Sequence, residues 1–200
     1  MAAPRHVVRV SRFAVATMLV GGLAGGWPSA AWAQAVAADG VFTIPDGAYS
    51  LSAPQGWKRV QPKSRIVETE FQIPGAESAE PGRMTVMGAG GTVEANIDRW
   101  YGQFAQPDGS ATKDRATTKR MKIAGCDVTV VDIAGTYKDM PGGPFAGGQT
   151  VQRPDYRMLA AIVQTDGGNY FLKFYGPKET VAANADGFVK MVEGLVAATR

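Results

Sequence analysis

Histidine and cysteine are scarce in this chain of 200 residues, which contains one of each, His6 and Cys126. A Ser-His-Asp or Cys-His nucleophile system needs an imidazole, and so does a histidine-based zinc or iron site. Because His6 lies in a segment that we expect to be removed, the sequence predicts no metal and no cofactor. A single cysteine excludes an intramolecular disulfide, so apolar burial must hold the fold, and we expect Cys126 to be buried rather than reactive.

An excess of either charge is also missing once the first 33 residues are set apart. The whole chain has 21 Lys and Arg against 18 Asp and Glu. Arg5, Arg9 and Arg12 lie within residues 1–33, which contain no acidic residue, so 18 basic and 18 acidic residues remain. Binding to a phosphate backbone needs a concentrated positive surface. The composition therefore predicts no nucleic-acid partner.

Residues 1–33 have the pattern of a Sec-type signal peptide. The three arginines precede an apolar run at residues 13–23, and Ala31-Trp32-Ala33 matches the small-x-small cleavage pattern. A retained membrane anchor is the alternative, although about a dozen apolar residues are few for crossing a bilayer. We expect cleavage after Ala33 and a periplasmic or secreted protein without a transmembrane segment. Residues 34–40 would form a flexible N-terminus, and residues 41–198 a single domain.

Two apolar runs, residues 158–163 and 170–175, flank the sequence Thr165-Asp166-Gly167-Gly168-Asn169. Asp-Gly and Gly-Gly permit the positive φ angles of short hairpin loops, so this stretch predicts a β-hairpin. Both alternating faces of residues 158–163 are apolar, which is typical of a strand covered on both sides. The sequence therefore predicts a central hairpin with a layer above it and a layer below it.

The remaining periodicities predict an antiparallel sheet and two helices. Thr92 is a candidate N-cap for a helix whose apolar stripe is Val93, Ile97, Trp100 and Phe104. A second helix is expected over residues 179–198. Strands are expected at residues 41–44, 49–53, 66–73, 83–88, 117–123 and 127–137. The predicted fold class is α+β, an antiparallel sheet with helices on both faces, which is an α/β/α sandwich.

Several charged residues occupy unusual positions in the predicted strands. Asp132 and Lys173 each lie mid-strand among apolar neighbours, and we predict that they could form an ion pair, structural or functional. Glu68 and Glu70 share one face of their strand. Such a pair marks the solvent face of an outer strand, or alternatively paired catalytic carboxylates.

Residues 138–155 are predicted to be a long loop, since they contain four glycines and three prolines and have no periodicity. Loops of this length inside a compact domain tend to be functional or disordered. Phe145 is an exposed aromatic candidate at its middle, and Arg153 lies near its end. A recognition loop and a plain insertion both remain open.

These elements resemble the PsbP-like fold of photosystem II extrinsic proteins and of a Ran-binding import factor. The resemblance rests on the turn from Ala53-Pro54 into Trp57, on the helix with Trp100 and Phe104, and on residues 170–177 before a final helix. It covers residues 41–198 and implies a family of mostly non-enzymatic assembly and binding proteins. The 138–155 loop has no counterpart in that family, and the missing histidine means that metal sites of some members do not transfer.

The sequence predicts an exported, non-catalytic binding or assembly factor that contacts an unknown protein partner through the 138–155 loop. One alternative is a small-ligand carrier with a pocket between the sheet and a helix, lined by Trp100, Tyr101 or Tyr137. The other is a hydrolase that uses carboxylates alone, drawn from Glu68, Glu70, Asp127 and Asp132.

Overall fold

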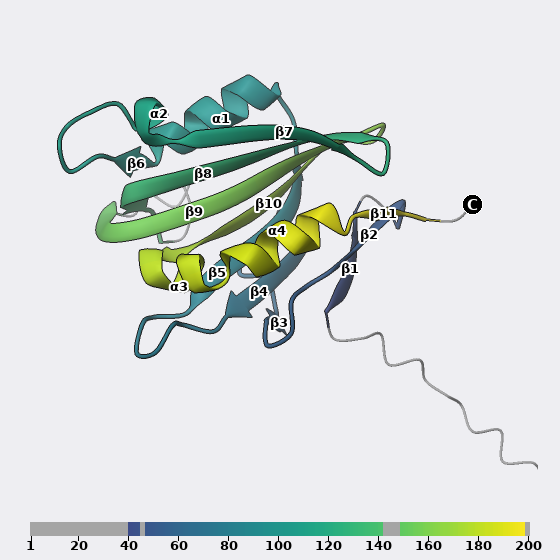
Figure 1. Ribbon diagram of the computed structural model, residues 1–200, viewed down its shortest axis with the longest axis horizontal. Helices are drawn as coiled ribbons and strands as arrows, with labels where there is room; N and C mark the ends of the chain where they lie inside the picture. Colours follow the sequence, from purple (N-terminus) through teal and green to yellow (C-terminus); the bar gives the residue numbers. More distant parts are fainter. Residues whose placement is uncertain (1–39, 45–46, 142–148, 199–200) are drawn as a thin grey trace, which may run out of the picture. The chain divides into compact units, whose positions relative to one another are not determined.

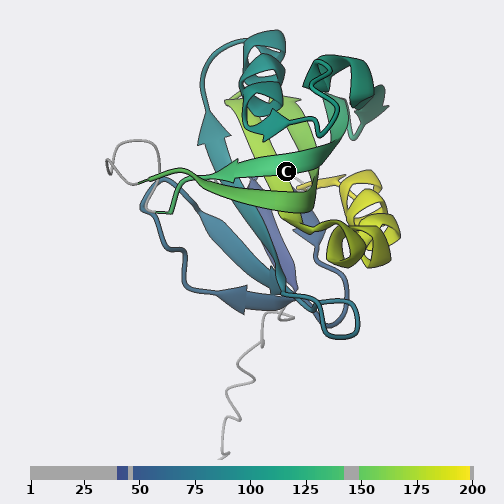
Figure 2. The same cartoon turned by 90° about the vertical axis from the view of Figure 1, so that its left-hand side faces the viewer.

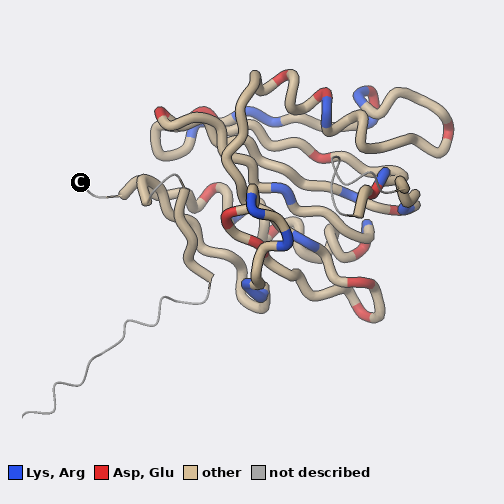
Figure 3. The backbone as a smooth tube through the Cα atoms, turned by 180° about the vertical axis from the view of Figure 1, so that it is seen from behind, with Lys and Arg blue, Asp and Glu red and all other residues tan. Residues whose placement is uncertain are grey.

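In the computed structural model of the protein, the described residues are 40–44, 47–141 and 149–198. The expected signal segment, nearly all of the expected flexible N-terminus and Phe145 lie outside these ranges. No helix of the described residues is long and apolar enough to cross a membrane. Lys and Arg are interspersed with Asp and Glu over the described chain (Figure 3).

The described residues form two antiparallel sheets and four helices (Figure 1). The larger sheet has the strand order β3-β4-β5-β10-β9-β8-β6, with β7 also paired to β8, and the smaller has the order β1-β2-β11. This confirms the predicted α+β class with an antiparallel sheet. The strands are β1 Val41–Ile44, β2 Tyr49–Ser52, β3 Lys58–Val60, β4 Thr69–Ile73, β5 Gly82–Ala89, β6 Phe104–Ala105, β7 Thr117–Ile123, β8 Cys126–Asp139, β9 Val151–Thr165, β10 Gly168–Pro177 and β11 Val196–Ala197. The helices are α1 Val93–Gly102, α2 Thr112–Arg115, α3 Lys178–Ala183 and α4 Ala185–Glu193.

The hairpin predicted around Asp166-Gly167 is present as β9 and β10, at the middle of the larger sheet. The ladder begins at the Gly168–Thr165 pair, and the Thr165 hydroxyl donates to the Gly168 carbonyl oxygen at 2.9 Å. The Asp-Gly turn thus sets the register of the whole hairpin, because its length fixes which residues face each other.

The apolar core consists of two clusters, and each contains one face of β9. The first combines Met158, Ala160 and Ile162 with Val93, Ile97 and Trp100 of α1. The second combines Leu159, Ala161 and Val163 with Phe188, Met191 and Val192 of α4. Alternate residues of a strand point to opposite faces, so both faces of this strand are buried, as the sequence predicted.

The start of α1 and the end of the chain show one success and one error of prediction. Thr92 is the N-cap of α1, and its hydroxyl accepts from the Ala95 N–H at 3.1 Å. The single helix expected over residues 179–198 is instead α3 and α4, separated at Asn184, followed by β11. The Asn184 side chain bonds both the Thr180 carbonyl and the Trp57 indole N–H, and such side-chain bonds compete with helical backbone bonds.

The predicted loop at residues 138–155 is shorter than expected, because β8 continues to Asp139 and β9 starts at Val151. Between the Gly135–Tyr156 pair and the Tyr137–Arg153 pair, β9 advances one residue more than β8. This bulge contains Pro154, which has no N–H to give to a ladder, and Asp155, at φ 52°. The proline that suggested a loop therefore lies in a strand irregularity.

Candidate functional site

Asp132 and Lys173 do not form the predicted ion pair, because they lie on opposite faces of the sheet. Lys173 pairs with Ala160, whereas Asp132 pairs with the next residue of β9, Leu159. Adjacent rows of a sheet point to opposite sides, so the two side chains are separated by the strands. Asp132 instead accepts two hydrogen bonds from Arg157, at 2.8 and 2.6 Å.

Lys173 lies on the α1 face of the sheet, between two tyrosine rings. Its Nζ is 5.0 Å from the ring centroid of Tyr175 and 5.4 Å from that of Tyr137. It donates to Oε1 of Gln103 at 2.6 Å, and within the described residues it forms no ion pair. We call these four residues the lysine cluster. Their arrangement is that of a cation–π site whose cation belongs to the protein.

Each member of the lysine cluster is positioned by the backbone. Tyr175 lies two residues after Lys173 on β10 and therefore on the same face. Tyr137 is on β8, just past the bulge, with its ring centroid 5.2 Å from that of Tyr175. Gln103 caps the end of α1, and its carbonyl accepts from the Lys138 N–H at 2.8 Å. The end of α1, the bulge and the hairpin thus fix the cluster together.

A second layer of charged groups surrounds the lysine cluster. Arg83 of β5 donates to the Tyr175 hydroxyl at 2.7 Å and forms two hydrogen bonds of 2.8 Å with Glu70 of β4. The Glu70 side chain is 2% exposed. The prediction that Glu70 faces solvent is therefore wrong, because it shares its sheet row, and hence its face, with Thr85 and Lys173.

Burial lowers the pKa of Lys173 to about 7, and the positive charges of Arg83 and Arg99 act in the same direction, while Asp139 opposes them. The side chain is densely surrounded by protein yet keeps some solvent-accessible surface, so it is half-buried. A buried ammonium without a hydrogen-bonded carboxylate is disfavoured in such a setting.

The pKa of Glu70 is lowered, which favours its carboxylate form. Burial alone would raise this pKa, but the hydrogen bonds from Arg83 and from the Lys63 N–H, together with the charges of both residues, bring it below its ordinary value. Glu70 is ionised at neutral pH. It balances Arg83 and leaves Lys173 without a carboxylate of its own.

The structure places the predicted site residues at different locations. Tyr137 belongs to the lysine cluster, and Arg153 lies in β9, 3.4 Å from Asp139. Trp100 is buried and packs edge-to-face on Phe171, so it belongs to the core rather than to a pocket. Tyr101 is half-buried, and its hydroxyl lies 3.4 Å from that of Thr118.

Sequence reasoning missed Arg83, Gln103 and Tyr175. Lys173 and Tyr175 are two residues apart on one strand and therefore lie on the same face, which was a usable signal for Tyr175. Gln103 and Arg83 come from other elements, and their approach depends on how α1 and β5 lie against β10.

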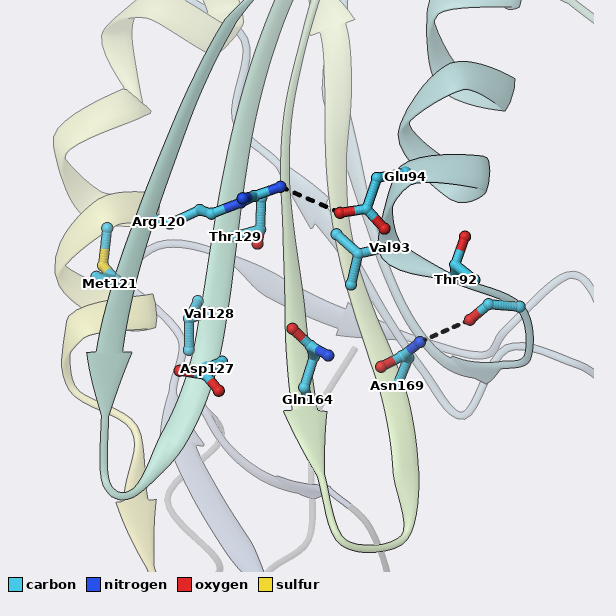
Figure 4. A pocket seen from close by; sticks show the side chains of 11 residues that line it. Thr92, Val93, Glu94, Arg120, Met121, Asp127, Val128, Thr129, Gln164 and Asn169 are labelled. Atoms are coloured by element: carbon cyan, nitrogen blue, oxygen red, sulfur yellow. Dashed lines mark hydrogen bonds and ion pairs between the residues drawn. The ribbon is translucent and has the colours of Figure 1, made fainter.

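A polar cleft of about 660 Å³ lies at the other end of α1, beside its first residues (Figure 4). The lining includes Arg120 of β7, Gln164 of β9 and Asn169 of β10. Arg120 forms an ion pair of 3.1 Å with Glu94 of α1, and Asn169 donates to the Gly91 carbonyl at 2.9 Å. The pocket predicted from Trp100, Tyr101 and Tyr137 is not this cleft, since none of the three lines it.

Among the described residues, no group of three or more His, Cys, Asp or Glu side chains could hold a metal ion. Cys126 is buried, as expected.

Comparison with known proteins finds distant structural similarity and assigns no function. No family model and no curated protein matches the chain. The solution structure of cyanobacterial PsbP from Synechocystis is similar over 82% of this chain and 95% of its own, with 12% identity and a TM-score of 0.49. The chain resembles the PsbP-like fold. A protein of unknown function from Pseudomonas aeruginosa is similar over 80% of this chain and 97% of its own, with 10% identity and a TM-score of 0.43. These likenesses concern the fold alone.

Proposed function

We propose that the protein is an exported, non-catalytic binding or assembly factor that contacts a protein partner through the end of the β8–β9 hairpin. This surface, which we call the hairpin end, comprises residues 137–140 and 151–156. This proposal rests on the observation that the pairing of β8 with β9 extends beyond the end of the neighbouring strand β10. The last pair of β10 is Pro177 with Tyr156, whereas β8 and β9 remain paired as far as Asp139 and Val151 (Figure 2).

The hairpin end has the chemistry of a contact surface. Along residues 151–153, beyond the bulge at Pro154, β9 is paired with β8 but not with β10, so one edge of its backbone is open, and open strand edges accept strands of other chains. Met140 and Val151, each 38% exposed, lie at the end of this hairpin, where Met140 follows β8 and Val151 begins β9. Arg153 and Asp139 add a half-exposed ion pair. Apolar side chains beside unpaired backbone groups favour a protein partner that contributes an extended segment.

Two of the four carboxylates that a hydrolase would use are occupied. Glu70 is paired with Arg83 and Asp132 with Arg157, each through two hydrogen bonds. Because the pKa of Glu70 is lowered, this group holds no proton to give near neutral pH. This favours binding over carboxylate catalysis.

Two further expectations belong to this proposal. We infer that residues 41–198 form an α/β/α sandwich, which is supported by the two core clusters that join α1 to one face of β9 and α4 to the other. We also infer that residues 1–33 are a signal peptide that is removed on export, since they combine a basic start, an apolar run and Ala31-Trp32-Ala33.

Site-specific photo-crosslinking in the producing cells tests the partner. A photoreactive amino acid is placed at Val151 in one variant and at Ile66, 68% exposed and away from the hairpin end, in the matched control. We expect a discrete crosslinked partner from position 151 that is absent from position 66 and weakened by Met140→Ser. The same products from both positions, or none from position 151 in a folded protein, would exclude the hairpin end.

A second candidate function, a small-ligand carrier, is favoured by the polar cleft beside α1. The side chains of Gln164 and Asn169 offer amide groups on its floor (Figure 4). Native mass spectrometry of protein from the producing cells should then show an additional bound mass, and Gln164→Trp should abolish it by filling the cleft. The apo mass alone under mild conditions would contradict this function.

A further inference from the structure

We propose that the polar cleft beside α1 binds an uncharged small saccharide and that the hydroxyl of Thr129 is a main contact of this ligand. The cleft belongs to the second candidate function, the small-ligand carrier, so this inference rests on that function and is independent of the hairpin end. Its support is a buried hydroxyl without a partner in the protein and the pairing of the charges around the cleft.

Thr129 lies on the face of the sheet that α1 covers. It is paired with Ile162 of β9, which belongs to the core cluster that includes α1, and residues directly opposite on neighbouring strands share a face. Gln164 is two residues further along β9 and is paired with Asn169 of β10, so both of these side chains lie on the same face. Val93, the first residue of α1, lines the cleft with them. The cleft is therefore the part of this face next to the start of α1 (Figure 4).

The Thr129 side chain is almost completely enclosed, yet its hydroxyl has no partner in the protein. The residue is 3% exposed, and its hydroxyl forms no hydrogen bond with any described residue. Within the described ranges no fully enclosed side-chain oxygen lacks a hydrogen bond, so this oxygen keeps some accessible surface, which faces the cleft that Thr129 lines. Buried polar side-chain atoms in native proteins usually have a partner. A hydroxyl, which can donate and accept, therefore points to a polar ligand group in the cleft.

The charged side chains around the cleft are already paired. The lining contains Glu94, Arg120 and Asp127. Glu94 and Arg120 form the ion pair of 3.1 Å described above, and the Asp127 carboxylate lies 3.4 Å from Nζ of Lys122. A charged ligand that left water would find no free counter-ion among these groups, and an unpaired charge in a partly enclosed site is costly. The cleft therefore favours a neutral ligand.

The uncharged groups of the lining fit a ligand that is rich in hydroxyls. The side-chain amide of Gln164 has no hydrogen-bond partner in the described part of the chain, and Asn169 gives its NH₂ to the Gly91 carbonyl and keeps its Oδ1 as an acceptor. Sugar hydroxyls donate and accept, so they can pair with Thr129 and with both amides. A purely apolar ligand would leave these groups unpaired. The volume of about 660 Å³ lies within the range of about 300–1,000 Å³ that is common for small-molecule sites.

Nuclear magnetic resonance titration tests the ligand class on the protein as purified from the producing cells. The protein is labelled with the heavy isotope of nitrogen, and the side-chain amide signals of Gln164 and Asn169 are followed. Glucose, galactose, mannose and N-acetylglucosamine are the neutral probes, and glucuronate and glucosamine are an anionic and a cationic probe of similar size. We expect a saturable shift of both amide signals with at least one neutral sugar, and weaker binding of the two charged sugars.

Substitution of Thr129 tests its hydroxyl. Thr129→Val keeps the shape of the side chain, and the loss of one neutral hydrogen bond should weaken sugar binding about two- to tenfold, whereas Thr129→Ser should retain it. Because the hydroxyl has no partner in the protein, Thr129→Val should have a Tm no lower than that of the wild type, so that weaker binding does not reflect a folding defect. Thr43→Val, on exposed β1 and outside the cleft, is the control and should change neither property.

Tighter binding of glucuronate or glucosamine than of every neutral sugar, or no shift with any neutral sugar, would overturn the saccharide site. Wild-type affinity in Thr129→Val, or a lower Tm of this variant, would contradict the role of its hydroxyl. Failure of the carrier function gives a different result. A retained mass that is not a saccharide would support the carrier and contradict this inference. Binding of added sugar by protein that leaves the cells with the apo mass would support the saccharide site and contradict the carrier.

Discussion

The substitution Glu70→Gln should destabilise the protein through loss of a buried charge. Glu70 is 2% exposed and accepts two hydrogen bonds of 2.8 Å from Arg83, with a third of 3.2 Å from the Lys63 N–H. A glutamine keeps the shape of the side chain but presents an amide NH₂ to a guanidinium that also only donates. One hydrogen bond to Arg83 is lost, and its charge is left without its counter-ion.

The expected cost follows from the strength of charged hydrogen bonds. Such a bond contributes about 1.5–3 kcal/mol, and water at the half-buried Arg83 recovers part of it, so we expect a loss of about 2 kcal/mol. For a domain of this size that corresponds to a decrease in Tm of about 4–8 °C. The effect should be measured by thermal and urea unfolding at neutral pH, followed by tryptophan fluorescence.

The pH dependence provides a sharper test of the reasoning. The pKa of Glu70 in the folded protein lies below its ordinary value of 4.5. Its ionised form therefore stabilises the fold fully above about pH 4.5, and this contribution is lost as the pH falls through the folded pKa. The difference in unfolding free energy between the wild type and Glu70→Gln should shrink as the pH falls below 4.5.

Glu94→Gln is the matched control, since it breaks the exposed Glu94–Arg120 pair, whose side chains are 68% and 69% exposed. Exposed pairs contribute about 0–1 kcal/mol, so this variant should unfold close to the wild type. Equal stability of Glu70→Gln and the wild type, or a difference that is the same at acidic and neutral pH, would refute the role of the buried charge.

Three further substitutions test the fold and the lysine cluster. Thr92→Ala removes the cap of α1 and should lower the unfolding free energy by about 1 kcal/mol in urea titration, whereas Thr92→Ser should retain it. Gly135→Ala should cost about 1–3 kcal/mol, because Gly135 has φ 149° and an added Cβ would lie 2.7 Å from the Ala105 carbonyl oxygen; Gly102→Ala, with open space around it, is the control. The pKa of Lys173 falls from 10.5 to about 7 on folding, so the protonated amine opposes folding fully below pH 7 and not at all above about 10.5. The stability of the wild type relative to Lys173→Met should therefore increase between about pH 7 and pH 10 in urea titrations. A relative stability that stays constant or falls over this range would show that Lys173 keeps an ordinary pKa.

The local elements could be predicted because neighbouring residues determine them. Asp166-Gly167 permits few conformations other than a short hairpin turn, and Thr92 offers a hydroxyl where a helix needs an acceptor. The alternation around Leu159 indicated burial on both faces, and the two core clusters confirm it. Two local predictions were wrong. Pro154 lies in a bulge of β9 rather than in a loop, and Asn184 interrupts the last helix while it accepts a hydrogen bond from the distant Trp57.

The sequence by itself determined the antiparallel sheet, its central hairpin and the capped helix, because turn chemistry and periodicity act over a few residues. Tertiary structure alone decided that Asp132 and Lys173 lie on opposite faces, since the register between strands determines which residues of two strands share a face. It also decided that Glu70 is buried against Arg83 and that Gln103 reaches Lys173. These contacts join residues 13 and 70 positions apart, and their formation depends on how strands and helix pack rather than on any local pattern.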